Sequence, residues 1–365
     1  MEQREHLLYM SEQINILYSE AVALLKQLIA TPSFSKEESD TAAIIGKFFA
    51  LKGIAASRVG NNIFAVNKYY SESKQSVLLN SHHDTVKPNK GYTLDPFLPI
   101  ESDNKLFGLG SNDAGGCLVS LIATFLYFYE QENLSHNIVF AASAEEEISG
   151  INGIELILLH LGNIEFGIVG EPTQMQMAVA ERGLMVIDCT AIGKSGHAAR
   201  NEGANALYKA IDDINWIRNF HFDKVSPLLG DSKMTVTIIE TENKQHNVVP
   251  AQCKFVIDVR VNELYTFDEI LQTLKQNLKS EFQPRTTRMK PTSISLDHVL
   301  VKAGLDLGRT YYGSPTTSDK ALMPFPTLKM GPGDSARSHT ADEYIYLDEI
   351  KEGIELYIKL LNQIL

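Results

Sequence analysis

Cysteine is scarce in this chain. Its 365 residues include three cysteines, Cys117, Cys189 and Cys253, which stand in apolar or strand-like contexts and show no CxxC spacing. Neither a disulfide framework nor a thiolate zinc site is therefore indicated, and we expect all three thiols to be small core residues. Any metal ion must then be held by histidines and carboxylates.

Long apolar runs and an excess of basic residues are also missing. No run approaches the ~18 apolar residues of a membrane span, and the first residues lack the basic and apolar regions of a signal peptide. The formal net charge of −12 argues against nucleic acid as a partner, because a phosphate backbone requires a basic patch. We expect a cytoplasmic protein with neither a nucleic-acid nor a membrane partner.

The length and composition are those of a globular protein with a large core. Hydrophobic residues make up 44% of the chain and charged residues 21%, and there are no internal repeats or low-complexity segments. A single core stops growing at roughly 250–300 residues. The chain is therefore expected to form two domains.

The first half of the chain alternates between two kinds of segment. Segments with helical periodicity are separated by short apolar runs that are typical of buried strands. The predicted helices are 14–30, 40–53, 117–131 and 150–161, and the predicted strands are 62–70, 75–81, 137–144 and 166–170. This alternation predicts an α/β domain with a mostly parallel central sheet.

A different pattern begins near Met185. Strands with alternating, β-branched residues are predicted at 184–193, 233–242 and 253–263, with helices at 203–220 and 267–281. This pattern favours an α+β unit inserted into the first domain. The predicted boundaries are 1–179 and 290–365 for the main domain and 180–289 for the insert.

Histidine or acidic residues follow the predicted strands of the main domain. "VLLN" leads to "SHHDTV", "NIVFAASA" to "EEEISG", "FGIVG" to "EPT", and "PTLKMG" to "PGDSARSHT". Ligands of open α/β sheets collect beyond the carboxyl ends of the strands. A single such residue is more often a helix cap or a packing residue. Together, however, they predict one site, made of His82, Asp84, Asp113, Glu145, Glu146, Glu147, Glu171 and His339.

The composition of this cluster points to metal binding. Asp113 lies in the glycine-rich stretch "FGLGSNDAGG", which lacks the spacing and the lysine of a phosphate-binding loop. Carboxylates with two imidazoles and no thiolate suit zinc, cobalt or manganese. One bridging carboxylate would suit two ions about 3.5–4 Å apart. The positive charge of two ions would also offset the repulsion among the clustered acids.

These motifs resemble, in order and along nearly the whole chain, those of the M20 metallopeptidase and deacylase family. "SHHDTV" is similar to the family's His-x-Asp, "GLGSNDAGG" to its bridging-Asp loop, and "AEEEISG" to its Asp-Glu-Glu element. "GEPT", "GKSGHAAR" and "SHTADEY" are similar to its third ligand strand, its lid histidine and its final histidine. The resemblance implies a zinc-exopeptidase-like catalytic domain with an inserted dimerisation, or lid, domain.

The resemblance also implies roles for individual residues. His82 and Glu171 would bind one metal ion, Glu147 and His339 the other, and Asp113 would bridge both. Asp84 would fix the tautomer and orientation of His82. Glu146 would be the general base, which takes a proton from the attacking water and passes it to the leaving amine.

Three residues of the insert match lid positions of the family. His197 would complete the active site of the partner subunit in a homodimer by donating a hydrogen bond to the oxyanion. Asn247 and Arg260 resemble residues that contact substrate. Arg260 would suit a substrate carboxylate through a bidentate contact, with a structural ion pair as the alternative. His83 falls on a variable position of the family and is expected to be a solvent or packing residue.

The chain departs from the family pattern at two places. Leu109 stands where an arginine is usual, and the loop is one residue shorter after Asp113. Glu145 stands where the family has Asp. Neither departure removes a predicted ligand, but the packing around the loop and the geometry around Glu145 are less safely transferred.

The leading functional hypothesis is an amidohydrolase acting on an N-acyl amino acid, most like acetylornithine deacetylase in arginine biosynthesis. Close alternatives are an N-acetyl- or N-succinyl-citrulline deacylase and succinyl-diaminopimelate desuccinylase. A dipeptidase or aminopeptidase would use the same metals and base. The alternative from another class is a metal-binding protein without activity.

Overall fold

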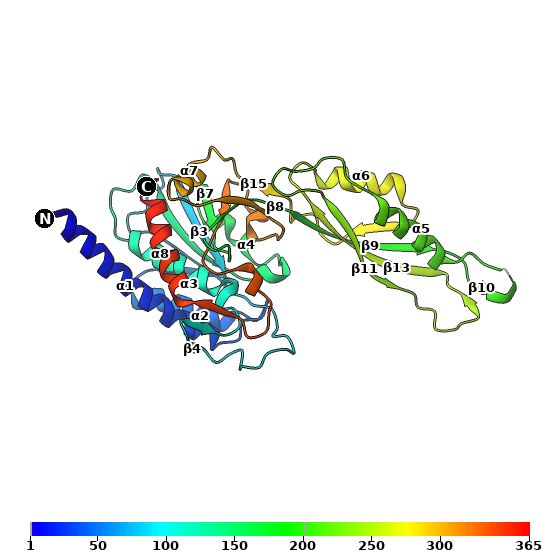
Figure 1. The fold of residues 1–365 in the computed structure, drawn as a ribbon, viewed down its shortest axis with the longest axis horizontal. Coiled ribbons are helices and arrows are strands. Elements are labelled where there is room, and N and C mark those ends of the chain that lie inside the picture. The colour runs from blue at the N-terminus through cyan, green and yellow to red at the C-terminus, as the bar shows by residue number, and fades with distance from the viewer. Residues whose placement is uncertain (1, 201) are drawn as a thin grey trace. The chain divides into compact units, whose positions relative to one another are not determined.

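The computed structural model describes residues 2–200 and 202–365. The chain divides into two compact units, whose elements are labelled in Figure 1. The first unit comprises Met1–Val179, Ile294–Tyr312 and Ser318–Leu365, and the second comprises Ala180–Ser293 and Gly313–Thr317. Within the described ranges, no helix combines the length and apolar character needed to cross a membrane.

The first unit is built around a sheet whose middle strands run parallel. Pairing is parallel among β6, β3, β7 and β17, and antiparallel for β1, β2 and β8. Every residue of β3 and β6 is buried, as expected of parallel strands that are covered on both faces. In spatial order the strands are β1 (Ala56–Val59), β2 (Asn62–Val66), β6 (Asn137–Ser143), β3 (Ser76–His82), β7 (Ile164–Val169), β17 (Thr327–Lys329) and β8 (Met177–Glu181).

Helices cover this sheet. The almost entirely buried α3 (Gly116–Phe128) packs on β3 and β6 and contacts α1 (Glu2–Ile29) and α8 (Leu347–Leu361). Helix α2 (Ser39–Leu51) packs on β1 and β2, and α7 (Val299–Asp306) contacts α8. The short α4 (Ile154–Ile157) belongs to a separate core cluster with Leu78 and Val139. The predicted α/β class with a mostly parallel sheet is therefore confirmed.

Other short strands pair in two places. β18 (Tyr344–Tyr346), β5 (Lys105–Phe107) and β4 (Ile100–Ser102) form a three-stranded sheet in that order. β15 (Thr292–Ser293) and β16 (Tyr311–Ser314) both pair with β8. The segment that precedes β18 carries His339.

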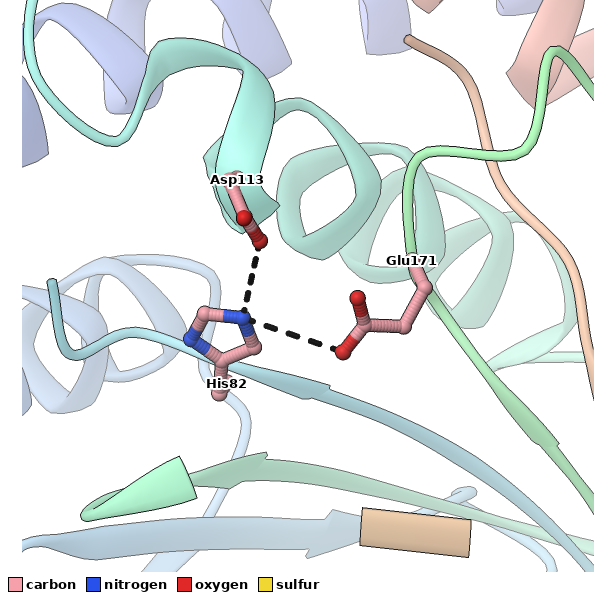
Figure 2. Close-up of side chains that lie close together, drawn as sticks. All are labelled: His82, Asp113 and Glu171. Carbon is pink, nitrogen blue, oxygen red and sulfur yellow. Dashed lines mark hydrogen bonds and ion pairs between the residues drawn. The ribbon is translucent and has the colours of Figure 1, made fainter. Parts of the chain in front are cut away.

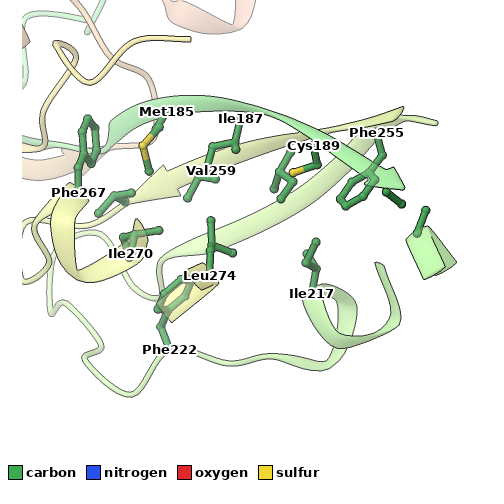
Figure 3. Packing of buried hydrophobic residues seen from close by; sticks show 14 of the residues in the cluster. Met185, Ile187, Cys189, Ile217, Phe222, Phe255, Val259, Phe267, Ile270 and Leu274 are labelled. Carbon is green, nitrogen blue, oxygen red and sulfur yellow. The ribbon is translucent and has the colours of Figure 1, made fainter. Parts of the chain in front are cut away.

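The second unit is an α+β structure. Its antiparallel sheet has the order β11 (Lys233–Glu240), β13 (Gln252–Val261), β9 (Gly183–Ile192) and β14 (Glu281–Pro284). Alternate side chains of β9 and β13 point toward the helices α5 (Ala206–Asn219) and α6 (Phe267–Asn277) and form one core (Figure 3). A separate ribbon pairs β10 (Gly196–His197) with β12 (Val248–Val249).

The predictions for cysteine and for one helix had different outcomes. Cys117, Cys189 and Cys253 are buried and free, which confirms the expectation that they are core residues.

The helix predicted at 150–161 was too long, because α4 covers only Ile154–Ile157 before a single 3₁₀ turn. At Gly153 the chain passes so close to the Ala144 carbonyl oxygen that an added Cβ would lie 2.4 Å from it. The segment before α4 is therefore held as a turn.

Candidate metal centre

Five predicted side chains gather beyond the carboxyl ends of the parallel strands. Two groups of potential ligands are found among the described residues, namely His82, Asp113 and Glu171 (Figure 2), and Asp113, Glu147 and His339. Within each group the ligand atoms lie within 4.8 Å of one another. Asp113 belongs to both groups.

Contacts at both ring nitrogens orient the side chain of His82. It is the last residue of β3, and its side chain is 1% exposed. Its Nδ1 lies 3.0 Å from the backbone oxygen of Asp84 and 3.4 Å from Asp84 Oδ1. Its Nε2 lies 3.3 Å from Asp113 Oδ1 and 3.8 Å from Glu171 Oε1. With Nδ1 occupied, Nε2 is the nitrogen available to a metal ion.

The carboxylate of Asp84 organises more than the imidazole beside it. It is fully buried and accepts the backbone N–H of Glu146 at 3.0 Å and that of Glu147 at 3.2 Å. The hydroxyl of Ser35 donates to the same carboxylate at 2.7 Å. Asp84 therefore holds the turn Glu146–Ile148, called the glutamate turn below, next to His82. The sequence did not predict this contact.

Asp113 is presented by a tight turn, Ser111–Gly115, directly before α3. The preceding Gly110 has a φ of 74°, and an added Cβ would lie 2.6 Å from Thr85 Cγ2, so the turn requires glycine. Asp113 Oδ1 faces His82 Nε2 at 3.3 Å, and Oδ2 faces His339 Nε2 at 3.6 Å. Two oxygens directed at two different imidazoles are the geometry of a bridging carboxylate.

The three glutamates after β6 have different neighbours. Glu147 lies 3.0 Å from His339 Nε2, and Glu146 Oε2 lies 4.0 Å from His82 Nε2. Glu145 instead accepts hydrogen bonds from the side-chain amide and the backbone N–H of Asn152, at 3.0 and 3.4 Å. Glu145, which stands where the family usually has Asp, therefore stabilises the turn that leads to α4.

The last two ligands come from different surroundings. Glu171 follows β7, where Gly170 bonds to Asn80 and Ser81 of β3 at 2.7 and 2.8 Å and so extends the contact between the strands to the ligand. His339 lies in the loop before β18, has a φ of 59°, and exposes 55% of its side chain. Its backbone oxygen accepts from Asn89 Nδ2 at 3.2 Å.

Burial and charge shift the pKa values of these groups. Burial raises the pKa of Glu146 well above its usual range, against the opposing effect of His82. For His82, burial disfavours the charged form, but hydrogen bonds with Asp113 and Asp84 outweigh it and raise the pKa well above the usual value. The hydrogen bond with Glu147 raises the pKa of His339 to about 9. In the absence of a metal ion, the surrounding carboxylates thus favour the charged form of both imidazoles.

The donor set fits two divalent cations. The carboxylates of Asp113, Glu147 and Glu171 surround two imidazoles, with Glu146 next to them and no thiolate in either group. Oxygen and imidazole donors of this kind suit zinc, manganese or cobalt. Two ions would supply the positive charge that the clustered acids lack.

His83, next to the first ligand, is a packing residue. It is buried, its Nδ1 lies 2.9 Å from Thr41 Oγ1, and its Nε2 lies 2.9 Å from the backbone oxygen of Asn61. Burial lowers the pKa of His83 to about 4. Of the two expectations for this residue, packing is the one that the structure supports.

The predicted residues of the insert lie in the second unit. His197, on β10, is exposed and accepts the N–H of Ala199 on Nδ1 at 3.2 Å, and the backbone oxygen of Asn247 accepts the N–H of Ala198 at 3.0 Å. His197 and Asn247 are therefore neighbours. Arg260 makes bonds of 2.8 and 3.1 Å to the carboxylate of Asp258 on the same strand, as in the ion-pair alternative.

Two further positions near the Asp113 turn are buried. Leu109, which stands where the family has arginine, is 5% exposed, and its N–H donates to the Pro96 carbonyl at 2.8 Å. Glu343 is 2% exposed and accepts the backbone N–H groups of Gly110, Asn112 and Asp113. This residue was not predicted, and its only signal in the sequence is its place in "SHTADEY".

Known proteins resemble the chain over most of its length. The succinyl-diaminopimelate desuccinylase of Pelagibacter ubique (strain HTCC1062) is 24% identical over 376 residues, covering 93% of this chain and 98% of the relative. The structure of aminopeptidase PepT from Bacillus cereus ATCC 10987 superposes with a TM-score of 0.77 at 18% identity, covering 95% of this chain and 98% of that one.

A further solved structure, that of the YXEP protein of Bacillus subtilis, is described as a dinuclear metal-binding peptidase of family M20. It has a TM-score of 0.72 at 13% identity and covers 95% of this chain and 98% of that one. At these identities the structural likenesses show the fold alone. Residues 78–363, however, match the profile of Peptidase family M20/M25/M40. The chain therefore belongs to Peptidase family M20/M25/M40 and is a metal-dependent hydrolase of amide bonds.

Proposed function

We propose that the protein removes the acyl group from an N-acyl amino acid with the help of two divalent metal ions. His82, Glu171 and Asp113 would hold one ion, and Asp113, Glu147 and His339 the other. Zinc is the first candidate, with cobalt and manganese as alternatives. The observation that carries the proposal is the position of Asp113, whose two oxygens face different imidazoles.

The residues around this centre suit amide hydrolysis. When bound, the two ions would polarise the amide carbonyl and acidify the attacking water. Glu146 would take the proton from that water and deliver it to the leaving nitrogen. Burial raises the pKa of Glu146, which makes it a stronger base than an exposed carboxylate and supports this role. Asp84 would place this base and orient His82 at the same time.

Replacing the proposed base tests the mechanism. Glu146→Gln should bind both ions and lose about 10²- to 10⁴-fold in turnover. Metal content by mass spectrometry and initial rates would be measured on the same preparation. A suitable control is Glu165→Gln, at a surface carboxylate bonded to His136 at 2.8 Å. Unchanged turnover in Glu146→Gln would refute the assignment of the base.

The relatives point to one substrate for the first assay. The relative described above is a succinyl-diaminopimelate desuccinylase, which favours N-succinyl-diaminopimelate. It gives no support to acetylornithine or to a role in arginine biosynthesis, which the sequence analysis placed first. A panel of N-succinyl-diaminopimelate, N-acetylornithine and acylated citrulline, with kcat/KM for each, would rank them.

Peptide hydrolysis is the second candidate. A dipeptidase or aminopeptidase would use the same ions and the same base, but it would have to hold a peptide and its free terminus. Dipeptide turnover without any deacylation would overturn the deacylase proposal. The alternative of a binding protein without activity is set aside by membership of a hydrolase family.

We also propose that the second unit forms a homodimer. Among the described residues, β11 is an outer strand of its sheet, and its side chains Ile238 and Ile239 are 51% and 47% exposed. Tyr208 and Ile211 of α5 are also exposed, at 67% and 40%. An uncovered strand edge and exposed apolar side chains favour association between copies. Light scattering at several concentrations would measure the oligomeric state.

His197 is proposed to act in the active site of the partner subunit, with Asn247 and Arg260 as substrate contacts. Two inactive variants test this arrangement. If His197→Ala and Glu146→Gln are mixed and exchange subunits, one site of the mixed dimer regains both groups, and part of the activity should return. No recovery despite demonstrated exchange would count against a shared site.

A further inference from the structure

A buried carboxylate outside the predicted ligand set is bonded to the turn that carries the bridging ligand. Glu343 Oε1 accepts the backbone N–H groups of Asn112 and Asp113 at 2.8 and 2.9 Å. Its Oε2 accepts the N–H of Gly110 at 3.1 Å. The backbone oxygen of Glu343 also accepts the N–H of Gly108, at 2.9 Å. Its side chain is 2% exposed.

These hydrogen bonds restrict the position of the Asp113 side chain. The three N–H groups belong to the few residues whose backbone sets the direction of the Asp113 side chain. Each of these N–H groups would be costly to leave without an acceptor in a buried site. The turn is therefore fixed by Glu343 in the conformation that directs Asp113 at both imidazoles.

Glu343 also connects the turn to the second metal group. It lies in the same short segment as His339, between that ligand and β18. When Glu343 holds the Asp113 turn, it also fixes the distance between the turn and the chain that carries His339. Asp113 and His339, whose Oδ2 and Nε2 atoms lie 3.6 Å apart, are thus tied by one side chain.

A second contact holds the same turn, so loss of Glu343 should leave the protein folded. Asn112 Nδ2 donates to the Asp334 carbonyl oxygen at 3.0 Å, and Asn112 Oδ1 accepts the N–H of Asp334 at 3.0 Å. This contact keeps the turn near the segment of His339. It involves only the Asn112 side chain, however, and leaves the N–H groups of Gly110 and Asp113 to Glu343.

We propose that Glu343 is the positioning residue of the bridging ligand, and that its hydrogen bonds to the Asp113 turn set the affinity and the magnetic coupling of the two metal ions. The proposal rests on the two-ion centre described under the proposed function. Partners that orient a ligand from outside the ligand set are each worth about 10- to 100-fold in metal affinity.

The experiment uses the full-length protein loaded with Mn(II). Glu343→Gln keeps the size of the side chain but replaces one acceptor oxygen by an NH₂ group, which would face the Gly110 N–H. Calorimetric titration of the metal-free protein gives the number of ions and their Kd values. Electron paramagnetic resonance reports the exchange coupling that a bridging carboxylate creates, a signature that does not depend on catalytic activity.

Two further variants complete the design. Asp213→Asn is the matched control, because this buried carboxylate in the second unit accepts the N–H groups of Lys279 and Ser280 at 3.1 and 2.8 Å. Glu343→Asp retains a carboxyl group on a shorter side chain and should recover part of the coupling. If Glu343→Gln does not fold, as judged by circular dichroism, the same comparison is made with Glu343→Asp.

We expect Glu343→Gln to weaken Mn(II) binding by about 10- to 100-fold and to reduce the coupling, whereas Asp213→Asn leaves both unchanged. Wild-type affinity and coupling in a folded Glu343 variant would overturn the proposal. If the wild-type protein itself binds fewer than two ions, the two-ion centre of the proposed function fails instead. The two failures are therefore distinguishable.

Discussion

The two groups of ligands contain the same kinds of side chain but differ in burial. The side chain of His82 is 1% exposed and that of its partner Asp84 is fully buried. The side chain of His339 is 55% exposed, and its loop is held by Asn89 and by Asp342, which bonds to Thr93 and Leu94. The imidazole of the first group is therefore held by the sheet, and that of the second group by a loop.

This difference suggests a division between the two ion sites. The orientation of His82 follows from the pairing of β3 and from Asp84, and so it does not require a metal ion. His339 has solvent on one side and a loop backbone on the other. We therefore expect the ion beside His82 to be the tighter of the two, and the ion beside His339 to be the one that depends on loop contacts.

The largest predicted effect is a difference in the free energy of unfolding between the metal-free variants His82→Ala and His339→Ala. His82→Ala leaves the buried carboxylate of Asp84 without its imidazole partner, which should lower the free energy of unfolding by about 3–5 kcal/mol. His339→Ala removes a largely exposed contact, so its cost should stay below about 1 kcal/mol. Urea unfolding followed by circular dichroism measures both. Equal costs would contradict the contrast between the two groups.

A smaller effect is expected when the residues behind the histidines are changed. Asp84→Asn should weaken the ion beside His82 by about 10- to 100-fold, because the amide cannot accept at both positions where Glu146 and Glu147 donate. Asp342→Asn should weaken the ion beside His339 by less, since water can replace the lost acceptor at this exposed side chain. Calorimetric titration of the two variants gives both Kd values. A larger loss in Asp342→Asn would reverse the ranking of the sites.

Much of this site could be predicted from the sequence, and the reason is topological. His82, Glu147 and Glu171 follow buried parallel strands, so their motifs had to meet at one edge of the sheet. Asp113 and His339 lie on loops, and although their residue types placed them in the predicted cluster, only the resemblance to a family assigned Asp113 its bridging role. The bonds from Asp84 to the glutamate turn and from Glu343 to the Asp113 turn depend on backbone groups brought together by folding, for which the sequence carries no local pattern.

The spacing of two charged residues on β13 predicts one specific contact. Asp258 and Arg260 are two residues apart on β13, and side chains at this spacing lie on the same face of a strand. Their ion pair was therefore predictable as a specific contact rather than as a general alternative. The length of α4 was not predictable in this way, since it is limited by the close approach of Gly153 to Ala144.

Partial removal of metal should show that the Kd values of the two sites differ by about tenfold or more. This is the lower end of the effect that orienting partners have on metal affinity. Limited dialysis of the loaded protein against a chelator is expected to remove the ion beside His339 first, because that ligand is the more exposed. Metal analysis should then pass through a stage with one ion per chain. Reloading that intermediate with Co(II) and recording its spectrum in wild type and in His339→Ala would identify the emptied site. Loss of both ions in one step would argue against two sites of unequal affinity.

The smallest predicted effect comes from a matched pair of hydroxyl groups. Ser35 Oγ donates to Asp84 at 2.7 Å, and Thr93 Oγ1 donates to Asp342 at 2.6 Å. Ser35→Ala should lower the free energy of unfolding by about 1.5 kcal/mol, the lower end for a hydrogen bond to a charged group, because the carboxylate is buried. Thr93→Val should cost less, since water can take its place. Both variants remove the same kind of bond, so a larger loss in Thr93→Val would show that loop contacts, rather than burial, dominate the stability around the centre.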